Sequence, residues 1–279
     1  METVAPISVI IPYYNRRLFI DECLDSVFRQ TLAPTEIIIV DDGSKPEQRR
    51  YLDKFLPQVR IIDLPINRGA AGARNAGIDA AREEWIAFND SDDIWEPNKL
   101  ELQWQHLQAN PACDGVHTPI RSFFADGSEH VSAPAASPLA LSDALHQNMI
   151  RVQSLLVRTS VLRALHGFDA TLRLCEDDDL GIRLAQHGYR IDCLRTPLAR
   201  MRRTHDDHLW GSNWRAMIAA KAAVAWRHRR LLESRLGRGA TRRRIAHALR
   251  KVGHARGRLV GRLLFVSGWV LGGFDSATD

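Results

Sequence analysis

Short apolar runs alternate with segments of helical periodicity over residues 1–110. In the segment 18–30, Ile20, Leu24 and Val27 recur at the spacing that places them on one face of a helix. Near-continuous apolar strands that alternate with helices are typical of a parallel sheet covered on both faces. By this pattern, strands are expected at residues 7–12, 36–41, 59–64 and 85–89, and helices at 18–30, 46–55, 70–82 and 98–109.

The pattern becomes less regular after residue 110. The segment 125–138, rich in Ala, Ser and Pro, is expected to be a loop. Strands of a mixed part of the sheet are expected at 116–124, 153–158 and 189–194, with a helix at 176–187. We therefore predict an α/β domain over residues 1–210 and a helical extension over residues 211–279.

The charge of the chain is divided unevenly along its length. The net charge is +5, yet residues 1–194 carry 28 acidic and 19 basic side chains, whereas residues 195–262 carry 3 acidic and 19 basic ones. An acidic body with a basic extension indicates two separate roles. The four cysteines form no C-x-x-C pair, and no basic segment followed by a long apolar run opens the chain. These features favour a reduced, cytoplasmic protein.

Three carboxylates follow the apolar strand at residues 85–89, in the sequence Asp90-Ser91-Asp92-Asp93. Carboxylates at a strand end repel one another, and a hard cation such as Mg²⁺ or Mn²⁺ removes that repulsion while it binds the oxygens of a phosphate. The segment therefore predicts a metal-bridged phosphate site at the carboxyl edge of the sheet. A polar turn, with an acidic residue leading into the next helix, explains the tetrapeptide equally well on its own.

Polar side chains also end the first two strands, where Tyr13 and Tyr14 follow one strand and Asp41 and Asp42 the other. Because ligands of parallel sheets bind outside the carboxyl ends of the strands, these residues are expected to lie near Asp90. The tyrosines are suited to stacking on a base, and either aspartate to accepting a ring N–H. Packing of Tyr14 and turn capping by Asp42 are the plainer alternatives.

Three further features are candidates for site residues. Arg74, near a helix start, is suited to pairing with a diphosphate, and a solvated helix arginine explains it equally well. The run from Glu176 to Asp179 opens a predicted helix, where acids are stabilising by about 0.3–1 kcal/mol each. Four acids exceed what capping needs, so one of them is a candidate general base. His205 is a candidate metal ligand, against the more common solvated histidine.

Together these residues resemble the family-two glycosyltransferases with a GT-A fold. Each motif alone is weak, but their order and spacing over residues 5–205 are family-like. The matching pieces are Val9-Ile10-Ile11-Pro12-Tyr13-Tyr14-Asn15, Glu22-Cys23-Leu24-Asp25-Ser26-Val27, Ile39-Val40-Asp41-Asp42-Gly43-Ser44, Asn67-Arg68-Gly69, Ala73-Arg74-Asn75-Ala76-Gly77, Asn89-Asp90-Ser91-Asp92-Asp93, Gly167-Phe168-Asp169 and Glu176-Asp177.

The resemblance implies a Rossmann-like mixed sheet flanked by helices, with a nucleotide-sugar-binding half at residues 1–110 and an acceptor-binding half at 111–210. It implies an inverting transfer from a nucleotide-diphosphate sugar, most commonly a UDP-sugar, to a saccharide or lipid-linked acceptor. Asp177 would be the base, and Mg²⁺ or Mn²⁺ would stabilise the leaving diphosphate. The implied nucleotide-binding residues are Pro12, Tyr14, Asp41, Asp42, Arg74 and Asp90, and the metal ligands Asp92 and Asp90, with Asp92 the more direct.

Two positions depart from the family pattern, and two other functions compete with it. Tyr13 stands where the family often has Thr, a departure that would alter the base contacts. Asp178 stands where an aromatic residue is common, a departure that would alter the acceptor site. The first competing function is that of a sugar nucleotidyltransferase, a class that has a Gly-rich loop after the first strand. The turn at residues 12–17 contains no glycine and does not match that loop. A degenerate transferase domain that binds nucleic acid or membrane would not need its acidic motifs intact.

The basic extension predicts a peripheral membrane anchor. Between Thr241 and Arg262, apolar residues fall at helical spacing among many arginines, and residues 259–274 add an apolar stretch too short to span a bilayer. A basic helix with an apolar face lies in the membrane interface and is attracted to anionic lipid. We expect association with the inner face of the cell membrane and no nucleic-acid partner. Packing on the catalytic domain or dimer formation is the alternative.

Overall fold

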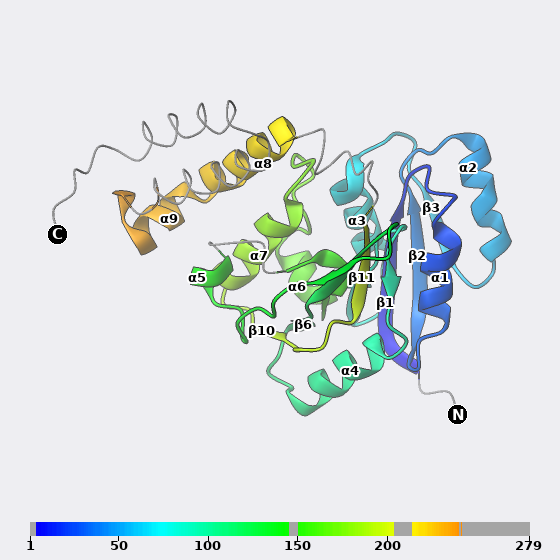
Figure 1. Ribbon diagram of the computed structural model, residues 1–279, viewed down its shortest axis with the longest axis horizontal. Helices are drawn as coiled ribbons and strands as arrows, with labels where there is room; N and C mark the ends of the chain where they lie inside the picture. The colour runs from blue at the N-terminus through cyan, green and yellow to red at the C-terminus, as the bar shows by residue number, and fades with distance from the viewer. Residues whose placement is uncertain (1–3, 145–149, 204–213, 240, 242–279) are drawn as a thin grey trace. The chain divides into compact units, whose positions relative to one another are not determined.

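The computed structural model describes residues 4–144, 150–203, 214–239 and 241 (Figure 1). The chain divides into two compact units, one at residues 1–205 and the other at residues 206–279. The first unit contains all the described strands, and two of the described helices lie in the second.

The larger sheet of the first unit has seven strands in the order β10-β6-β9-β4-β1-β2-β3. All neighbouring strands are parallel except at β9, which runs antiparallel to both β4 and β6. The predicted mixed sheet is therefore confirmed. The strands are β1 (Val4–Tyr13), β2 (Ala33–Asp41), β3 (Arg60–Asp63), β4 (Trp85–Phe88), β6 (Gly115–His117), β9 (Leu156–Arg158) and β10 (Ile191–Cys193).

A second sheet of four strands has the order β5-β11-β7-β8. The outer pairs, β5 with β11 and β7 with β8, are antiparallel, whereas β11 runs parallel to β7. The strands are β5 (Ile94–Trp95), β7 (Ile120–Phe124), β8 (Glu129–Val131) and β11 (Ala199–Arg203).

Helices connect these strands and cover the larger sheet. The helices are α1 (Ile20–Phe28), α2 (Pro46–Arg50), the 3₁₀ helix η1 (Tyr51–Phe55), α3 (Gly69–Ala80), α4 (Lys99–Ala109), α5 (Leu141–Ala144), the 3₁₀ helix η2 (Val152–Ser154), α6 (Thr159–Ala164) and α7 (Glu176–Gln186).

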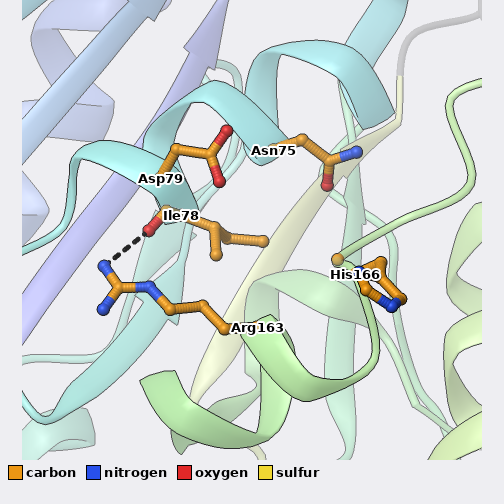
Figure 2. A pocket seen from close by; sticks show the side chains of 6 residues that line it. Asn75, Ile78, Asp79, Arg163 and His166 are labelled. Carbon is orange, nitrogen blue, oxygen red and sulfur yellow. Dashed lines mark hydrogen bonds between the residues drawn. The ribbon is translucent and has the colours of Figure 1, made fainter.

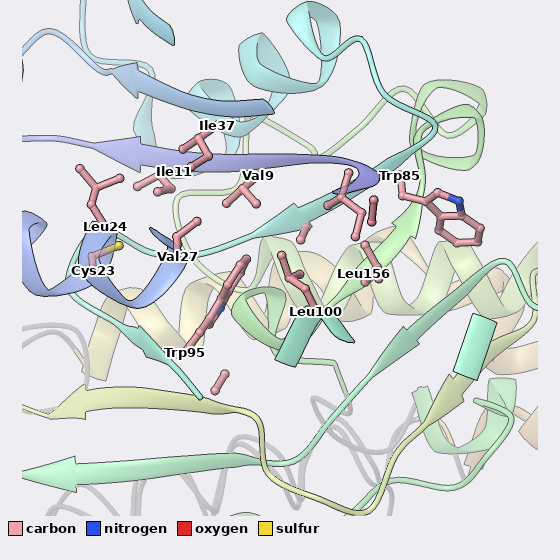
Figure 3. Close-up of a cluster of buried hydrophobic side chains, with 14 of the residues drawn as sticks. Val9, Ile11, Cys23, Leu24, Val27, Ile37, Trp85, Trp95, Leu100 and Leu156 are labelled. Atoms are coloured by element: carbon pink, nitrogen blue, oxygen red, sulfur yellow. The ribbon is translucent and has the colours of Figure 1, made fainter. Parts of the chain in front are cut away.

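Successive residues of β1 enter the cores on opposite faces of the sheet. Val9 and Ile11 belong to a cluster that includes Cys23, Leu24 and Val27 of α1 and Leu100 of α4 (Figure 3). Ile10 points the other way, toward α3, where an added Cβ on Gly77 would lie only 2.5 Å from Ile10 Cγ2. Because glycine has no side chain there, α3 packs directly against the strand. The sheet is thus covered on both faces, as its continuous apolar strands predict.

Apart from the short strand β5, which the sequence analysis did not predict, the first half of the chain follows the sequence prediction, with boundaries shifted by up to three residues. The later half differs in three ways. The predicted strand at 116–124 is two strands, β6 and β7, which belong to different sheets and are separated by Pro119, a residue that cannot donate to a ladder. The predicted loop at 125–138 contains β8. The sequence analysis did not predict β11, α5 or α6.

In the second unit the structure describes α8 (Trp214–Arg227) and α9 (Arg229–Leu236), which fall within the predicted helical extension. The indole of Trp226 is 67% exposed, and the guanidinium carbon of Arg229 lies 4.0 Å from its ring centre. Among the residues that the structure describes, no helix has the length and the apolar character needed to cross a bilayer. The apolar stretch 259–274 and the candidate ligand His205 lie outside the described residues.

Candidate active site

The carboxyl ends of β1, β2 and β4 bring the predicted site residues to one edge of the sheet. Tyr13 at the end of β1 is in register with Asp41 at the end of β2. The backbone N–H of Asp42 donates to the Tyr13 carbonyl at 2.8 Å, and that of Asn89, just before Asp90, donates to the Ile10 carbonyl at 3.1 Å. Ile10 and Asn89, which are 79 positions apart in the chain, are thus neighbours, and the ends of the three strands share a single edge.

Asp41 presents a buried carboxylate with spare acceptor capacity. Its Oδ2 accepts the backbone N–H of Ser44 at 3.2 Å, whereas its Oδ1 is buried and has no hydrogen-bond partner in the described part of the chain. Burial raises the pKa of Asp41 above its ordinary value. An unsatisfied buried acceptor is costly, so this oxygen is suited to accept an N–H from a ligand.

Asp42 has a structural task that the sequence did not show. Its two carboxylate oxygens accept the backbone N–H groups of Arg68 and Gly69, at 2.6 and 2.8 Å, where α3 begins. Burial raises the pKa of Asp42, and these two hydrogen bonds oppose that rise. Asp42 therefore caps α3 from a distant part of the chain and fixes that helix beside the ends of β1 and β2.

The two adjacent tyrosines have different environments. Tyr13 is buried, its hydroxyl donates to the Gln48 carbonyl at 3.2 Å, and burial raises the pKa of this phenol to about 12. Tyr14 is 48% exposed at the strand end. Pro12 lies within β1, in register with Val40, and is half-buried. Of the two rings, that of Tyr14 is placed to meet a ligand.

The three carboxylates after β4 do not all face the same way. The side chains of Asp90 and Asp92 are 29% and 30% exposed. Asp93 is buried, and its carboxylate accepts the Gln153 amide and the backbone N–H of Arg202, both at 2.9 Å. Burial, followed by the charges of Asp92 and Asp90, raises the pKa of Asp93 well above its ordinary value. Asp93 thus anchors the loop, and Asp90 and Asp92 remain on its outer side.

Arg202 of β11 is a site residue that the sequence analysis missed. Besides its backbone contact with Asp93, its Nε donates to the Asp92 carbonyl at 3.1 Å and its Nη2 donates to Glu22 at 2.5 Å. Its guanidinium also lies 4.8 Å from the ring centre of Phe123. No sequence motif marks an arginine that acts in this way, because its role depends on two strands of different sheets.

Arg74 links the loop after β4 to the start of α7. Its Nη2 donates to Asp90 Oδ1 at 2.6 Å and its Nη1 donates to Glu176 Oε1 at 2.7 Å. The guanidinium is 3% exposed and lies 5.4 Å from the ring centre of Phe168. Burial raises the pKa of Glu176, and the charge of Arg74 opposes that rise. Arg74 therefore positions two carboxylates rather than standing open to solvent.

Asn75, the next residue of α3, holds the loop that leads to α7. Its side-chain amide donates to the Phe168 carbonyl at 2.7 Å and accepts the Phe168 N–H at 2.8 Å. Gly167 has a φ of +65°, and an added Cβ there would lie 2.3 Å from Asn75 Oδ1. The motifs Arg74-Asn75 and Gly167-Phe168, which are far apart in the sequence, thus pack directly against each other in the fold.

Asp177 lies in the first turn of α7, next to Glu176. Its side chain is 16% exposed, and its Oδ2 lies 3.8 Å from Nη1 of Arg151. Its Oδ1 accepts the backbone N–H of Asp178 at 3.0 Å. Further along the helix, Asp179 is buried and accepts Arg183 Nε at 2.7 Å. Arg183 also donates to the carbonyls of Leu165 and Gly167, both at 2.8 Å, which ties α7 to the preceding loop. The four acids therefore differ in exposure and in partners.

An open hollow of about 300 Å³ lies between α3 and the turn after α6 (Figure 2). It is lined by Asn75, Ile78, Asp79, Arg163, His166 and Gly167. Arg163 donates to the Ile78 carbonyl at 3.1 Å across it. None of the strand-end carboxylates lines this hollow, so it is separate from the candidate active site.

The donor set at the strand ends fits a hard divalent cation. Asp90 and Asp92 offer partly exposed carboxylate oxygens on one short loop, and oxygen ligands are those that Mg²⁺ and Mn²⁺ prefer. Arg74 balances part of their charge, and the buried contacts of Asp93 fix the loop. The arrangement is suited to hold a metal together with a phosphate-bearing ligand.

Comparison with known proteins agrees with this geometry. The model of the family described as Glycosyl transferase family 2 matches residues 8–151. The β-1,3-glucosyltransferase WfgD of Escherichia coli, named for UDP-Glc and α-D-GlcNAc-diphosphoundecaprenol, is 40% identical over 105 residues, which are 37% of this chain and 42% of that protein. The chain spans less than two thirds of the length of the curated relatives that it matches first.

Solved structures show the same fold. TarS of S. aureus, in complex with UDP-GlcNAc, superimposes with a TM-score of 0.71 at 18% identity, covering 94% of this chain and 79% of that one. The mannosyltransferase PcManGT from Pyrobaculum calidifontis, in complex with GDP-Man and Mn²⁺, gives 0.59 at 20% identity, covering 95% and 81%. The predicted GT-A fold is therefore confirmed.

Proposed function

The chain belongs to glycosyl transferase family 2, and from this premise we propose that it moves a sugar from a nucleotide-diphosphate sugar to an acceptor hydroxyl, with inversion. The observation that carries the proposal is the link through Arg74. This buried arginine joins Asp90, at the predicted metal and diphosphate site, to Glu176, beside the predicted base. The site of the departing diphosphate and the residue that activates the acceptor would thus lie on either side of the Arg74 guanidinium.

The nucleotide is proposed to bind at the ends of β1 and β2. Asp41 Oδ1 would accept a ring N–H of the base, and the exposed ring of Tyr14 would stack on it. Pro12 and Asp42 would shape this end of the site, Asp42 by holding α3 in place. The complexes of TarS with UDP and UDP-GlcNAc support a nucleotide-sugar donor, with a UDP-sugar as the first candidate.

Asp92 and Asp90 are proposed to hold Mg²⁺ or Mn²⁺, and His205 remains a candidate third ligand. A bound divalent cation would neutralise the charge that develops on the departing diphosphate. The Mn²⁺ complex of PcManGT supports this assignment. Arg74, expected from the sequence to meet the diphosphate, is better suited to hold Asp90 in position, because both of its terminal nitrogens donate to carboxylates.

Asp177 is proposed to be the general base. As the acceptor oxygen attacks the anomeric carbon, its proton would pass to the Asp177 carboxylate, and the bond to the nucleoside diphosphate would break on the opposite side of the sugar. Arg151, 3.8 Å away, would help to orient this carboxylate. Asp178 would lie at the acceptor side, where the family pattern has an aromatic residue.

The acceptor is proposed to be a saccharide or a lipid-linked saccharide used in cell-surface polysaccharide or glycolipid synthesis. The lipid-linked substrate in the name of WfgD supports this class. The second unit would then hold the enzyme on the cytoplasmic face of the membrane. The exposed indole of Trp226 beside Arg229 supports that role, because such pairs suit the membrane interface.

The test uses the full chain in three steps. A thermal-shift panel of UDP- and GDP-sugars with Mn²⁺ identifies the donor, because a ligand of the native state raises apparent stability. Transfer to saccharide acceptors is then measured, and NMR of the product gives the anomeric configuration. Asp177→Asn should lower turnover by about 10²–10⁴-fold. The exposed carboxylate Asp79 supplies the control, since Asp79→Asn should leave turnover unchanged. A retained configuration, or equal rates for both variants, would refute the proposal.

A further inference from the structure

Three side chains of different chemistry converge at the far edge of the larger sheet. His106 of α4, Cys113 just before β6, and Asp192 of β10 place one nitrogen, one sulfur and one oxygen within 4.8 Å of one another. Cys113 and Asp192 are buried, and His106 is partly exposed. His106 Nε2 and Asp192 Oδ2 are 2.9 Å apart. The three residues come from separate elements, so the fold itself assembles the cluster.

The cluster lies away from the candidate active site. β10 is the edge strand next to β6, and β6 is separated from β4 by β9. Cys113 precedes β6, whereas the strand-end carboxylates follow β4, which has the same direction as β6. The cluster is therefore nearer the amino edge of the sheet, and the candidate active site is at the carboxyl edge.

The donor set differs in kind from that of the acidic loop. A thiolate, an imidazole and a single carboxylate form a ligand set of borderline softness, which suits Zn²⁺ and not Mg²⁺ or Mn²⁺. In a tetrahedral site with bonds of about 2.0–2.3 Å, the ligand atoms lie about 3.3–3.6 Å apart. The most distant pair, now within 4.8 Å, would need to close by about 1.2 Å at most, and the His106–Asp192 pair, now 2.9 Å apart, would need to open slightly. Rotation of the Cys113 thiol and a small shift of the partly exposed imidazole would supply that movement.

Arg190 holds the carboxylate of this cluster in place. Its Nε donates to Asp192 Oδ1 at 3.1 Å and its Nη2 donates to Asp192 Oδ2 at 3.2 Å. Hydrogen bonds of this type orient the ligands of metal sites, and their loss typically lowers metal affinity by about 10–100-fold. Arg190 also offsets the negative charge of a thiolate and a carboxylate brought together.

We propose that His106, Cys113 and Asp192 bind a Zn²⁺ ion that ties α4 to the β6–β10 edge of the sheet. Binding releases the thiol proton of Cys113, and a water molecule fills the fourth position. The ion would join His106 of α4 to Asp192 of β10, two residues that are 86 positions apart in the chain. Its role is structural, and it is independent of the proposed transferase activity.

The experiment uses the full chain after treatment with a chelator and exchange into metal-free buffer. Co²⁺ serves as a spectroscopic probe, because a cysteine ligand gives a thiolate-to-cobalt charge-transfer band. We expect one equivalent of Co²⁺ to produce this band and Zn²⁺ to abolish it by displacement. Absence of the band in the wild-type chain would overturn the proposal.

Matched variants separate this site from other metal sites and other thiols. Cys113→Ser should remove the band, whereas Cys193→Ser, which removes the thiol of the residue that follows Asp192 in β10, should keep it. The double variant Asp90→Asn/Asp92→Asn should also keep it. A band that persists in Cys113→Ser would overturn the assignment.

A second measurement covers the case in which Cys113→Ser fails to fold. His106→Gln alters a partly exposed side chain, and it should weaken Zn²⁺ affinity at least tenfold in a competition titration while the circular dichroism spectrum stays the same. Unchanged affinity would overturn the proposal.

Discussion

Arg74 Nη1 donates to Glu176 Oε1 at 2.7 Å, although the two residues are 102 positions apart in the chain. The same guanidinium also donates to Asp90, so one buried cation fixes both the loop after β4 and the start of α7. Bidentate bridging of this kind requires the planar fork of arginine.

Arg74→Lys should therefore fail to replace the native side chain. An ammonium has one charged nitrogen and cannot reach both carboxylates, so a buried carboxylate loses its partner at a cost of about 1–3 kcal/mol. We expect urea unfolding to show that loss of stability, and steady-state kinetics to show a fall in kcat larger than any rise in the donor KM. A rise in KM alone would instead indicate direct binding of the diphosphate.

Asp92→Asn should uncouple metal binding from nucleotide binding. In the wild-type chain, calorimetric titration with nucleoside diphosphate should give tighter binding with Mn²⁺ than with chelator, because the cation joins carboxylate and phosphate. The variant should show the weaker affinity under both conditions. Asp25→Asn, on the exposed face of α1, is the control. Equal affinity of the wild-type chain with and without Mn²⁺ would contradict the prediction.

Gly167→Ala should destabilise the first unit more than Gly127→Ala does. Both glycines have positive φ values, +65° and +84°, so alanine is strained at either position by about 1–2 kcal/mol. At Gly127 nothing lies within 4 Å of the added Cβ, whereas at Gly167 it would meet Asn75 Oδ1 at 2.3 Å. Thermal unfolding of both variants measures the difference. Equal losses would show that the contact with Asn75 has little weight.

His117 should make stability fall as the pH is lowered. It is buried, neither ring nitrogen has a hydrogen-bond partner in the described residues, and burial lowers its pKa to about 4. As the pH is lowered, the imidazole of the unfolded chain binds a proton near pH 6.5, whereas that of the folded chain binds one only near pH 4. The contribution of His117 to the free energy of unfolding is therefore complete above pH 6.5 and is lost as the pH falls toward 4. The loss is at most about 3 kcal/mol.

The measurement for His117 is a difference between variants, because buried carboxylates with raised pKa values, such as Asp41, act in the opposite sense over part of this range. The free energy of unfolding should fall less steeply between pH 6.5 and 4 in His117→Leu than in the wild-type chain. His130→Leu, at an exposed position of β8, should retain the wild-type slope. Parallel slopes for all three proteins would show that His117 titrates normally.

The full chain should pellet with anionic vesicles at low salt and be released as salt is raised, because each arginine near the surface contributes about 1 kcal/mol that salt screens. Trp226→Ala should weaken the association, since the exposed indole is suited to the interface. Vesicles of neutral lipid are the control. Failure of the wild-type chain to pellet at low salt would remove the membrane role.

Local patterns predicted the elements whose environment is uniform along the chain. The strands β1, β2 and β4 are apolar on both faces, so their sequence shows them without any knowledge of their neighbours. β11 contains three arginines among five residues, and guanidinium groups of this strand lie over the ring of Phe123. A charged strand that packs by its guanidinium faces has no apolar alternation to detect.

The positions of the strand-end residues were equally predictable, but their partners were not. Parallel strands require Tyr14, Asp41 and Asp90 to share one edge. The orientation of each carboxylate depends on remote groups instead. Asp42 meets the backbone of Gly69, and Asp93 meets the backbone of Arg202. These contacts arise only when the chain is folded, and no spacing in the sequence encodes them.

The buried carboxylate of Asp93 has a consequence for anyone who recombines members of this family. Its two partners, Gln153 and Arg202, both lie beyond residue 110, whereas the loop that it anchors lies before it. A chimaera joined near residue 110 that imports a second half without equivalents of these partners would leave Asp93 buried and unsatisfied. The two halves are therefore not interchangeable parts, and an exchange of halves between relatives should give a stable fold only when this pair of partners is transplanted as well.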